Sequence, residues 1–169
     1  MPFRIIRDDI TRVSADAIVN TANPMPGYAD GTDRAIYTAA GADELLAERG
    51  KIGAIGRGEA AVTKAFRLPA RFIIHTVGPI YKGRKEDADN LYSCYFNSLE
   101  LARKNDIHSI AFPAISCGVY GFPIDKAAEI AVSTVIKYAR YYNCFDKIVF
   151  IDLNPNVIYE YEKQINCHR

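Results

Sequence analysis

Short apolar runs recur along the chain and predict six β-strands. Three of them, FIIHTV, SIAFPAI and KIVFIDL, are apolar at almost every position. Such runs are typical of strands that are covered on both faces, as in α/β sheets. The connection RLPAR is short and contains a proline, so we expect the strands on either side of it to be antiparallel neighbours in a mixed sheet. The predicted strands are Phe3–Ile6, Ala15–Asn20, Ala60–Phe66, Phe72–Val77, Ser109–Ala114 and Lys147–Leu153.

Between these runs, apolar residues recur at steps of three and four, the spacing of one face of an α-helix. The pattern is strongest after residue 123, where Asp125 near the start and Arg140 near the end also suit the helix dipole. Asn154 and Pro155 favour the N-cap and first turn of a last helix. The predicted helices run from Thr32 to Gly41, from Asp43 to Arg49, through Leu91 and Ala102, from Ile124 through Tyr138, and from Pro155 through Ile165. Strands that alternate with helices predict an α/β fold of three layers, α/β/α, around a mixed sheet of about six strands.

Length and charge restrict the possible functions. At ~150 residues per domain, the 169 residues predict a single domain over residues 1–169. Such a chain buries ~70% of its unfolded surface and needs no disulfide or metal ion for stability. Lys and Arg number 21 and Asp and Glu 20, a net charge of +1. This balance argues against a dedicated nucleic-acid-binding protein, which usually has a basic excess, and leaves room for a small local anion site.

The apolar runs bear on where the protein is located in the cell, and the spacing of its cysteines bears on metal binding. No apolar run reaches the ~18 residues of a membrane span, and the first residues are charged where a signal peptide would be apolar. We therefore expect a cytoplasmic protein. Cys94, Cys117, Cys144 and Cys167 form no CxxC pair, so we expect free thiols. Only Cys167 and His168 are near each other among possible zinc ligands, so no metal site is predicted.

Two loops that leave predicted strands carry the strongest candidate chemistry. The first spans Asn20–Asp33 and the second Pro113–Pro123, and each leads into a helix. In α/β sheets, ligands bind outside the carboxyl ends of the strands. Glycines let backbone N–H groups approach a ligand, and helix N-termini favour anions. Two such loops face to face could hold a diphosphate without Lys or Arg. The alternative is a pair of ordinary turns, because Gly and Pro are common in turns.

Three other features are weaker. The Gly53–Gly58 stretch reads GxxGxG with no strand before it, so it matches neither a dinucleotide fingerprint nor a P-loop, and we interpret it as a flexible connection. Cys117 in the second loop could act as a nucleophile with His75 as its base. His75 lies in the middle of a predicted strand, however, which favours packing or a hydrogen-bonded core position. The Asp8–Asp9 pair is either a turn at a strand end or a carboxylate acceptor for an amino group such as that of adenine.

Seven segments in a fixed order are more specific than any single motif. They are Asp9–Thr11, Asp16–Asn23, Gly31–Asp33, Ala39–Gly41, Gly58–Ala60, Ile74–Pro79 and Ala111–Gly121. Together they cover nearly the whole chain and resemble the macro domains, a family that binds ADP-ribose. The branch that the chain resembles most is the MacroD-type group. That group includes hydrolases that remove ADP-ribose from acidic side chains and that deacetylate O-acetyl-ADP-ribose.

The resemblance implies binding roles at the adenine and in the first loop. Asp9, with the backbone of Ile10, would hold the adenine edge. Asn20 would brace the first loop, and Ala22 is among the residues that the resemblance assigns to ligand binding. These assignments favour the functional interpretation of the Asp8–Asp9 pair.

At the diphosphate and the distal ribose, the resemblance implies binding by the main chain and catalysis by two side chains. Gly31 and Thr32 would close on the phosphates and the distal ribose. The residues whose main-chain N–H groups would surround the diphosphate are Ser116, Cys117, Gly118, Val119 and Tyr120. Asn23 would hydrogen-bond the distal ribose, and Asp33 would orient or polarise the attacking water. Donors that stabilise developing charge and a phosphate of the ligand itself complete this mechanism, which requires no metal ion or other cofactor.

Three positions depart from the family pattern. The glycine run that usually precedes the aspartate is the Tyr28–Gly31 segment here, which adds a ring and a carboxylate near the distal ribose. Tyr37 stands where the hydrolases often have His, and the reference pKa of tyrosine is near 10 rather than 6.5. Leu153 stands where an aromatic ring often stacks on adenine, a contact of ~0.5–1.5 kcal/mol. These changes bear on catalysis and affinity rather than on the fold.

Because Asn23 and Asp33 both remain, we predict an ADP-ribose-binding hydrolase of mono-ADP-ribosyl esters. Its substrates would be ADP-ribosylated Asp or Glu on proteins, or O-acetyl-ADP-ribose. The alternative is a reader module that binds ADP-ribose or a related nucleotide without catalysis. A nucleic-acid partner is disfavoured by the net charge of +1.

Overall fold

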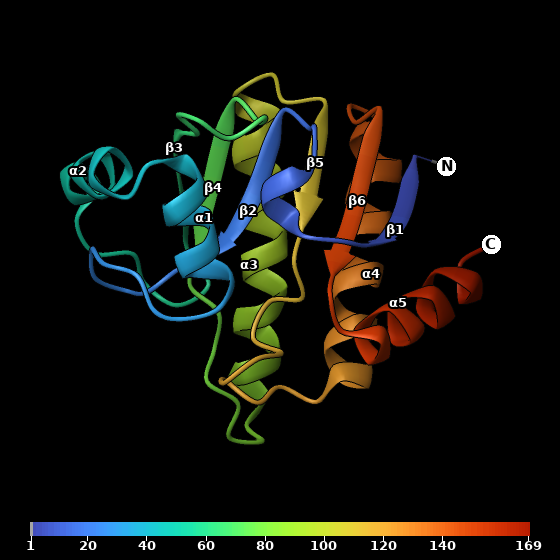
Figure 1. The fold of residues 1–169 in the computed structure, drawn as a ribbon. Helices are drawn as coiled ribbons and strands as arrows, with labels where there is room; N and C mark the ends of the chain where they lie inside the picture. Colours follow the sequence, from blue (N-terminus) through green and yellow to red (C-terminus); the bar gives the residue numbers. More distant parts are fainter. Residues whose placement is uncertain (1) are drawn as a thin grey trace.

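A six-stranded sheet separates two layers of helices in the computed structural model, which describes residues 2–169 (Figure 1). The strands are β1 (Phe3–Arg7), β2 (Ala17–Thr21), β3 (Ala60–Lys64), β4 (Phe72–Thr76), β5 (Ser109–Phe112) and β6 (Lys147–Asp152). Their order in the sheet is β1-β6-β5-β2-β4-β3. All neighbouring pairs are parallel except β3 and β4, which are antiparallel as the short connection between them predicts. The predicted mixed sheet in an α/β/α arrangement is thus confirmed.

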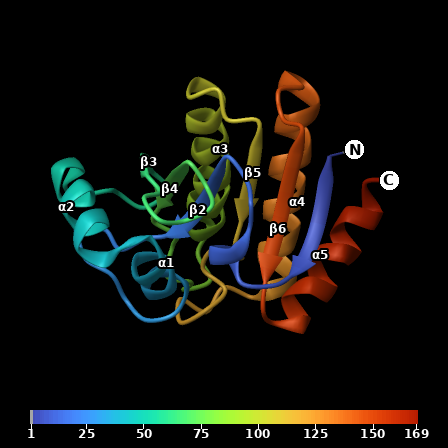
Figure 2. The same cartoon turned by 45° about the horizontal axis from the view of Figure 1, so that its top comes forward.

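The helices divide between the two faces of the sheet (Figure 2). One face is covered by α3 (Lys85–Lys104), α4 (Ile124–Tyr142) and α5 (Pro155–Cys167), and the other by α1 (Thr32–Ala40), α2 (Ala42–Ile52) and the 3-10 helix η1 (Ile10–Arg12). Both faces of β2 are therefore buried: Ala17 and Val19 pack into the larger core and Ile18 into the smaller one. None of the helices in the described part of the chain is long and apolar enough to cross a membrane.

Several elements end earlier or later than predicted, each for a local reason. β2 begins at Ala17 rather than Ala15, because the Asp16 carboxylate accepts hydrogen bonds from the backbone N–H groups of His108 (2.8 Å) and Ser109 (3.1 Å) in place of a regular ladder. β3 ends at residue 64 because Phe66 has a φ of 51°, outside the extended region. β5 ends just before Pro113, which has no N–H to continue the sheet.

The Gly53–Gly58 connection, interpreted from sequence as flexible, is held to the rest of the fold at Ile55 and Gly58. The side chain of Ile55 is buried, and its backbone N–H donates to Pro24 O (2.8 Å). Gly58 has a φ of +83°, and a Cβ there would lie 3.1 Å from Ser93 Cβ. The glycine is needed for this turn, and the connection fixes the first loop from behind.

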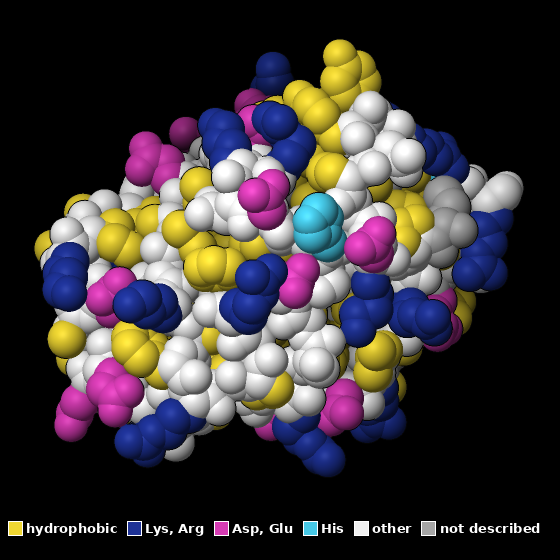
Figure 3. Space-filling model, turned by 90° about the horizontal axis from the view of Figure 1, so that it is seen from above, with side chains coloured by type: hydrophobic (Ala, Val, Ile, Leu, Met, Phe, Trp, Pro, Cys, Tyr) yellow, Lys and Arg dark blue, Asp and Glu magenta, His cyan; other side chains and the backbone are white. Residues whose placement is uncertain are grey.

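The parallel strands bring distant loops to one end of the sheet. β2, β5 and β6 are adjacent, with Ile18 opposite Ala111 and Phe112 opposite Phe150. The segments after these strands, residues 22–31, 113–123 and 153–154, therefore lie together at their carboxyl ends (Figure 1). The opposite end of the molecule has basic and acidic side chains interspersed, without a continuous basic surface (Figure 3).

Candidate functional site

Two adjoining cavities open at the carboxyl ends of the parallel strands. The main cavity has a volume of about 420 Å³ and lies between the first and second loops, with Asp152, Asn154 and Val157 at its side. The side cavity, of about 280 Å³, lies against residues 8–10 and 151–153. The two cavities share four lining residues, Gly31, Thr32, Pro113 and Asp152. A single elongated ligand can therefore occupy both.

Most of the residues singled out from sequence meet at these cavities. Those that line the main cavity are Asn23, Gly31, Thr32, Asp33, Ser116, Cys117, Gly118, Val119 and Tyr120. Asp9 and Ile10 line the side cavity. Asn20 and Ala22 are buried and are not among the residues that line either cavity. Asn20 can therefore affect a ligand only through the residues that it supports.

The second loop exposes main-chain donors. Phe122 N–H donates to Ser116 O (2.9 Å) and Gly121 N–H to Gly118 O (3.0 Å), which closes the loop into a compact turn. The N–H groups of Ser116, Gly118, Val119 and Tyr120 donate to no acceptor within residues 2–169. Successive unpaired N–H groups in such a turn form a concave site for an anion. This loop can hold a phosphate without a basic side chain.

The first loop ends at a helix N-terminus that faces the same cavity. α1 begins after Gly31, whose φ is 89°, and no side chain caps its first turn. The first N–H groups of a helix have no partner within the helix, and they concentrate the positive end of its dipole. No Lys or Arg among the described residues lines either cavity. The positive potential available to a ligand there comes from main-chain N–H groups on both sides.

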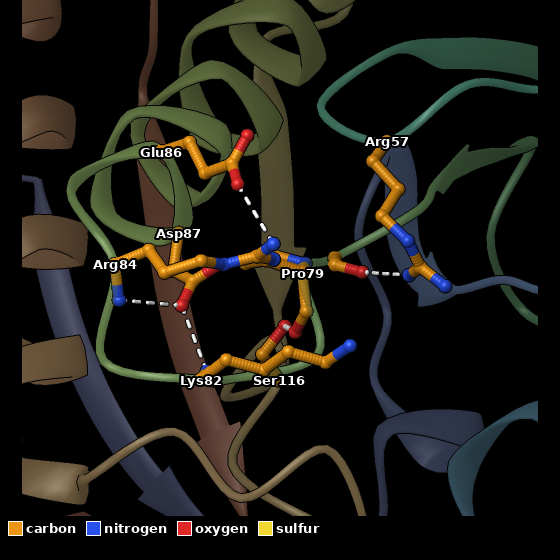
Figure 4. Close-up of polar contacts among 8 residues, drawn as sticks. Arg57, Pro79, Lys82, Arg84, Glu86, Asp87 and Ser116 are labelled. Carbon is orange, nitrogen blue, oxygen red and sulfur yellow. Dashed lines mark hydrogen bonds and ion pairs between the residues drawn. The ribbon is translucent and has the colours of Figure 1, made fainter.

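A tight contact behind the second loop fixes its backbone (Figure 4). Ser116 has a φ of 65°, and its hydroxyl donates to Pro79 O (2.8 Å). Gly78 lies directly beneath this turn. A Cβ at Gly78 would lie 2.2 Å from Ser116 Oγ and 2.8 Å from Ile115 Cγ2, so only glycine fits. The conformation of the second loop therefore depends on the segment that leaves β4.

Arg57 supports the same loop from outside. Its guanidinium donates to Gly78 O (2.7 Å; Figure 4) and lies 5.5 Å from the centre of the Tyr120 ring. Tyr81 N–H donates to Tyr120 O (2.9 Å). Because Arg57 holds Tyr120 from behind, it acts as a support for the loop rather than as a lining residue of the cavity.

Asp87 fixes the far end of that supporting segment (Figure 4). Its buried carboxylate accepts hydrogen bonds from Lys82 N (2.8 Å), Arg84 N (3.0 Å) and the Arg84 side chain (3.1 Å). These bonds, led by the one from Lys82, hold the pKa of Asp87 below its usual value. The turn between β4 and α3 is thus fixed at both ends.

Beneath the first loop lies a chain of buried polar side chains. Thr63 Oγ1 donates to Lys64 O (3.0 Å), so it accepts from His75 Nε2 (2.9 Å). His75 Nδ1 is then the acceptor for Asn20 Nδ2 (3.1 Å), whose other hydrogen goes to Asp33 Oδ1 (2.8 Å). Burial lowers the pKa of His75 to about 3, so the ring is neutral. The chain of hydrogen bonds fixes the direction of the Asn20 amide and leaves its Oδ1 without a partner among the described residues.

Asp33 is the last side chain in this series of hydrogen bonds, and it lines the main cavity. Its second oxygen, Oδ2, accepts from Ala29 N–H (3.0 Å), which closes the end of the first loop. Burial raises the pKa of Asp33, and the hydrogen bonds from Asn20 and Ala29 act in the opposite direction. A carboxylate has about four lone-pair positions, so each oxygen can still accept from a water molecule. The arrangement suits a carboxylate that orients water.

Arg49 was not found from sequence, although it organises the first loop. It lies on α2, is 1% exposed, and donates to Asn23 O (3.1 Å), Pro24 O (3.2 Å) and Gly53 O. Its charge also lowers the pKa of Asp33, against the larger effect of burial. A signal was present in the sequence: Arg49 stands four residues after Leu45, on the apolar face of α2.

The residues that depart from the family pattern form a stack beside the site. Tyr37 is buried and stacks on Tyr28 at 4.7 Å, and Arg34 lies 5.7 Å from the centre of the Tyr28 ring. Arg34 also pairs with Asp30 at 2.9 Å. Burial, with a smaller effect of the Asp33 charge, raises the pKa of Tyr37 to about 12. Tyr37 therefore stays protonated and lies behind the cavity rather than in it.

The structure does not bring Cys117 and His75 together as a nucleophile and base. Both ring nitrogens of His75 are engaged, with Asn20 and Thr63. Burial, reinforced by the charge of Asp152, raises the pKa of the Cys117 thiol to about 12. His75 occupies a hydrogen-bonded core position, which was the alternative expected from sequence.

The fold and the two loops define a class of protein. The family model described as Macro domain matches residues 19–131, and the chain belongs to this family. The chain is 47% identical over 165 residues to a macro domain-containing protein of Ralstonia nicotianae, and the alignment covers 97% of this chain and 94% of that protein. It is 46% identical over 157 residues to the O-acetyl-ADP-ribose deacetylase of Citrobacter rodentium, covering 86% of this chain and 89% of that one.

Solved structures agree with this assignment. A mutant of the Oceanobacillus iheyensis macrodomain, solved with ADPR, superimposes with a TM-score of 0.93 and 35% identity and covers 98% of this chain and 92% of that one. The Trypanosoma brucei macrodomain in complex with ADP-ribose gives a TM-score of 0.92 and 36% identity, covering 97% of this chain and 69% of that one. The resemblance to macro domains that the sequence motifs indicate is confirmed.

Proposed function

We propose that this protein binds ADP-ribose and hydrolyses mono-ADP-ribosyl esters, either ADP-ribosylated Asp or Glu on proteins or O-acetyl-ADP-ribose. The observation that carries the proposal is the pair of main-chain donor surfaces on opposite sides of a cavity without basic side chains. Such a site neutralises a diphosphate through N–H groups and the helix dipole. The relatives named above as binding ADP-ribose, and the one named as a deacetylase, support the same ligand.

The diphosphate would lie in the main cavity, and the adenine would enter the side cavity against Asp9 and Ile10. Asp9 Oδ1 already accepts from the Thr11 backbone N–H (2.9 Å) and hydroxyl (2.7 Å), where it caps η1. Its other oxygen is the one left to accept a hydrogen bond from the adenine amino group. Asp9 caps η1, the turn role that the sequence offered, and in this proposal it would also contact the adenine.

The distal ribose would reach Asn23 and Asp33 at the other end of the main cavity. For an ester on an acidic side chain, a water molecule attacks the anomeric carbon, and the side-chain carboxylate leaves with the bonding electron pair. Asp33 orients this water and accepts its proton. Burial raises the pKa of Asp33, which makes the carboxylate a stronger base. The Asn23 side chain positions the sugar, and Arg49 holds the Asn23 backbone.

The second candidate function is a reader module that binds ADP-ribose without catalysis, and one observation favours it. Both oxygens of Asp33 accept hydrogen bonds from the protein, and the side chain is only 3% exposed. In a reader, a carboxylate that accepts from the protein at both oxygens would serve to fix the conformation of its loop, a role that needs no bound water.

The two candidates are separated by a turnover assay. Purified protein is incubated with a peptide that carries ADP-ribose on glutamate, and with O-acetyl-ADP-ribose, and the released products are quantified. Calorimetry measures the affinity for ADP-ribose in parallel. Release that is lost in Asp33→Ala supports the hydrolase. Binding without release supports the reader, and the absence of binding contradicts both.

A further inference from the structure

One carboxylate occupies the junction of the two cavities and has no assigned role. Asp152 is the last residue of β6 and lines both the main and the side cavity. Of the four residues that the cavities share, only Asp152 and Thr32 have side chains that form hydrogen bonds. Asp152 Oδ1 accepts from Asn154 N–H (2.9 Å), and its other oxygen has no partner in the described part of the chain.

The connectivity of the ligand decides what reaches this junction. In ADP-ribose, the ribose of the adenosine lies between the adenine and the diphosphate. With adenine in the side cavity and the diphosphate in the main cavity, as in the proposed function on which this step rests, that ribose must pass the residues that both cavities share. Its hydroxyls then lie near Asp152. A carboxylate that accepts from a ribose hydroxyl is a common way to recognise an unmodified adenosine.

We propose that Asp152 determines specificity at the adenosine ribose: it accepts a hydrogen bond from the 2′-hydroxyl and excludes nucleotides that carry a 2′-phosphate. The surrounding charges support this exclusion. Asp8 and Asp9 line the side cavity together with Asp152, and no basic residue among those that the structure describes lines it. A 2′-phosphate would bring further negative charge against these three carboxylates.

Two arginines lie close to this region outside the lining. Arg12 lies 3.9 Å from Asp8, and Arg7 Nε donates to Leu153 O (3.0 Å). Neither arginine lines a cavity. In the wild-type protein, the negative charge of Asp152 would repel a 2′-phosphate before either arginine could pair with it. Removal of that charge should therefore raise the relative affinity for the phosphorylated ligand.

The test is calorimetric titration with ADP-ribose and with ADP-ribose 2′-phosphate. The variant is Asp152→Asn, which keeps the acceptor for Asn154 and removes the charge. The matched control is Asp146→Asn, an exposed residue just before the first residue of the same strand, at the opposite end of the sheet. The wild-type protein should bind the 2′-phosphate at least about tenfold more weakly. Asp152→Asn should reduce the ratio of the two affinities severalfold, and Asp146→Asn should leave this ratio unchanged.

The outcomes separate this proposal from the function on which it rests. Equal affinity of the wild-type protein for the two ligands overturns the role of Asp152 while ADP-ribose binding stands. A ratio that Asp152→Asn does not change overturns it as well. If neither ligand binds, the proposed function fails together with this inference. Circular dichroism and the melting temperature of Asp152→Asn show whether the variant is folded.

Discussion

The two sides of the main cavity are built in different ways. The second loop presents main-chain N–H groups, and its shape depends on close backbone contacts such as the one between Ser116 and Gly78. The first loop rests on buried polar side chains, Asn20, Asp33 and Arg49, whose hydrogen bonds lie beneath the cavity. The first arrangement is suited to holding an anion, and the second to holding a carboxylate and a sugar in a fixed position. Binding and catalysis should therefore respond to different substitutions.

The largest expected effect is on the side that binds through the main chain. Gly118→Glu places bulk and negative charge where the diphosphate would lie. A Cβ at Gly118 meets nothing within 4 Å, so the variant should fold. Like charges in contact cost several kcal/mol, so affinity for ADP-ribose should fall about 100-fold or more. Calorimetry measures the loss, with Gly118→Ala as the control that adds little bulk. Unchanged affinity in Gly118→Glu would place the diphosphate elsewhere.

On the opposite side of the cavity, Asp33→Asn should affect turnover far more than binding. The substitution keeps the shape of the side chain and removes the base. General-base catalysis contributes about 10²–10⁴ in rate, so kcat for ester hydrolysis should fall by about 100-fold or more. The affinity for ADP-ribose should change much less. A variant that keeps full turnover would mean that Asp33 only shapes its loop.

Arg49→Leu tests whether the first loop depends on its buried side chains. The substitution leaves the carbonyl oxygens of Asn23, Pro24 and Gly53 without their donor. An unsatisfied buried group costs about 1–3 kcal/mol, so the free energy of unfolding should fall by about 2 kcal/mol or more. Urea denaturation measures the change. Arg67→Leu, at an exposed ion pair with Glu44, should change stability by less than about 1 kcal/mol. Equal effects would argue against a special role of Arg49.

His75 makes the free energy of unfolding depend on pH. Its pKa is lowered to about 3 in the folded protein, from about 6.5 when unfolded. Between these values the unfolded chain binds a proton that the folded chain does not, so stability falls as the pH falls below about 6.5. From pH 6.5 to 5 the loss should approach about 2 kcal/mol, at about 1.4 kcal/mol per pH unit. Urea denaturation at both values should show a smaller loss in His75→Gln. His108→Gln, at an exposed histidine, is the control and should keep the full loss.

The smallest expected effect is at the adenine end. Leu153 is 63% exposed and lines the side cavity. Leu153→Phe supplies a ring that can stack on adenine, a gain of about 0.5–1.5 kcal/mol. Affinity for ADP-ribose should rise about two- to tenfold by calorimetry, while affinity for ribose 5-phosphate, which has no adenine, should not rise. Equal gains for both ligands would assign the effect to something other than stacking.

The sequence predicted the sheet well because its central strands, β2, β4, β5 and β6, are covered on both faces and are therefore mostly apolar. It predicted the two loops because each places Gly and Pro between a strand and a helix. The polar chain under the first loop was not predictable in the same way. Asn20 and His75 are 55 residues apart and meet only because they face each other in the register of β2 and β4. Sequence patterns indicate which residues are buried, and a short connection indicates that two successive strands pair, but they do not show which strands far apart in the sequence lie side by side.

The same limit applies to Arg49 and Asp152. A buried arginine looks like a surface residue until the helix face that carries it is known. Asp152 follows an apolar strand as many turn residues do, and its position between two cavities depends on the order β6-β5-β2 in the sheet. The spacing of Arg49 from Leu45 is the sequence signal of its burial, whereas the place of Asp152 depends on tertiary structure alone.

A crystal structure of this protein with ADP-ribose would show directly which groups hold the diphosphate. We expect the oxygens of the diphosphate to lie within hydrogen-bond distance of the backbone N–H groups of Gly118, Val119 and Tyr120 and of the first turn of α1. Phosphates held instead by Lys or Arg side chains, or a nucleotide bound outside the two cavities, would contradict this expectation.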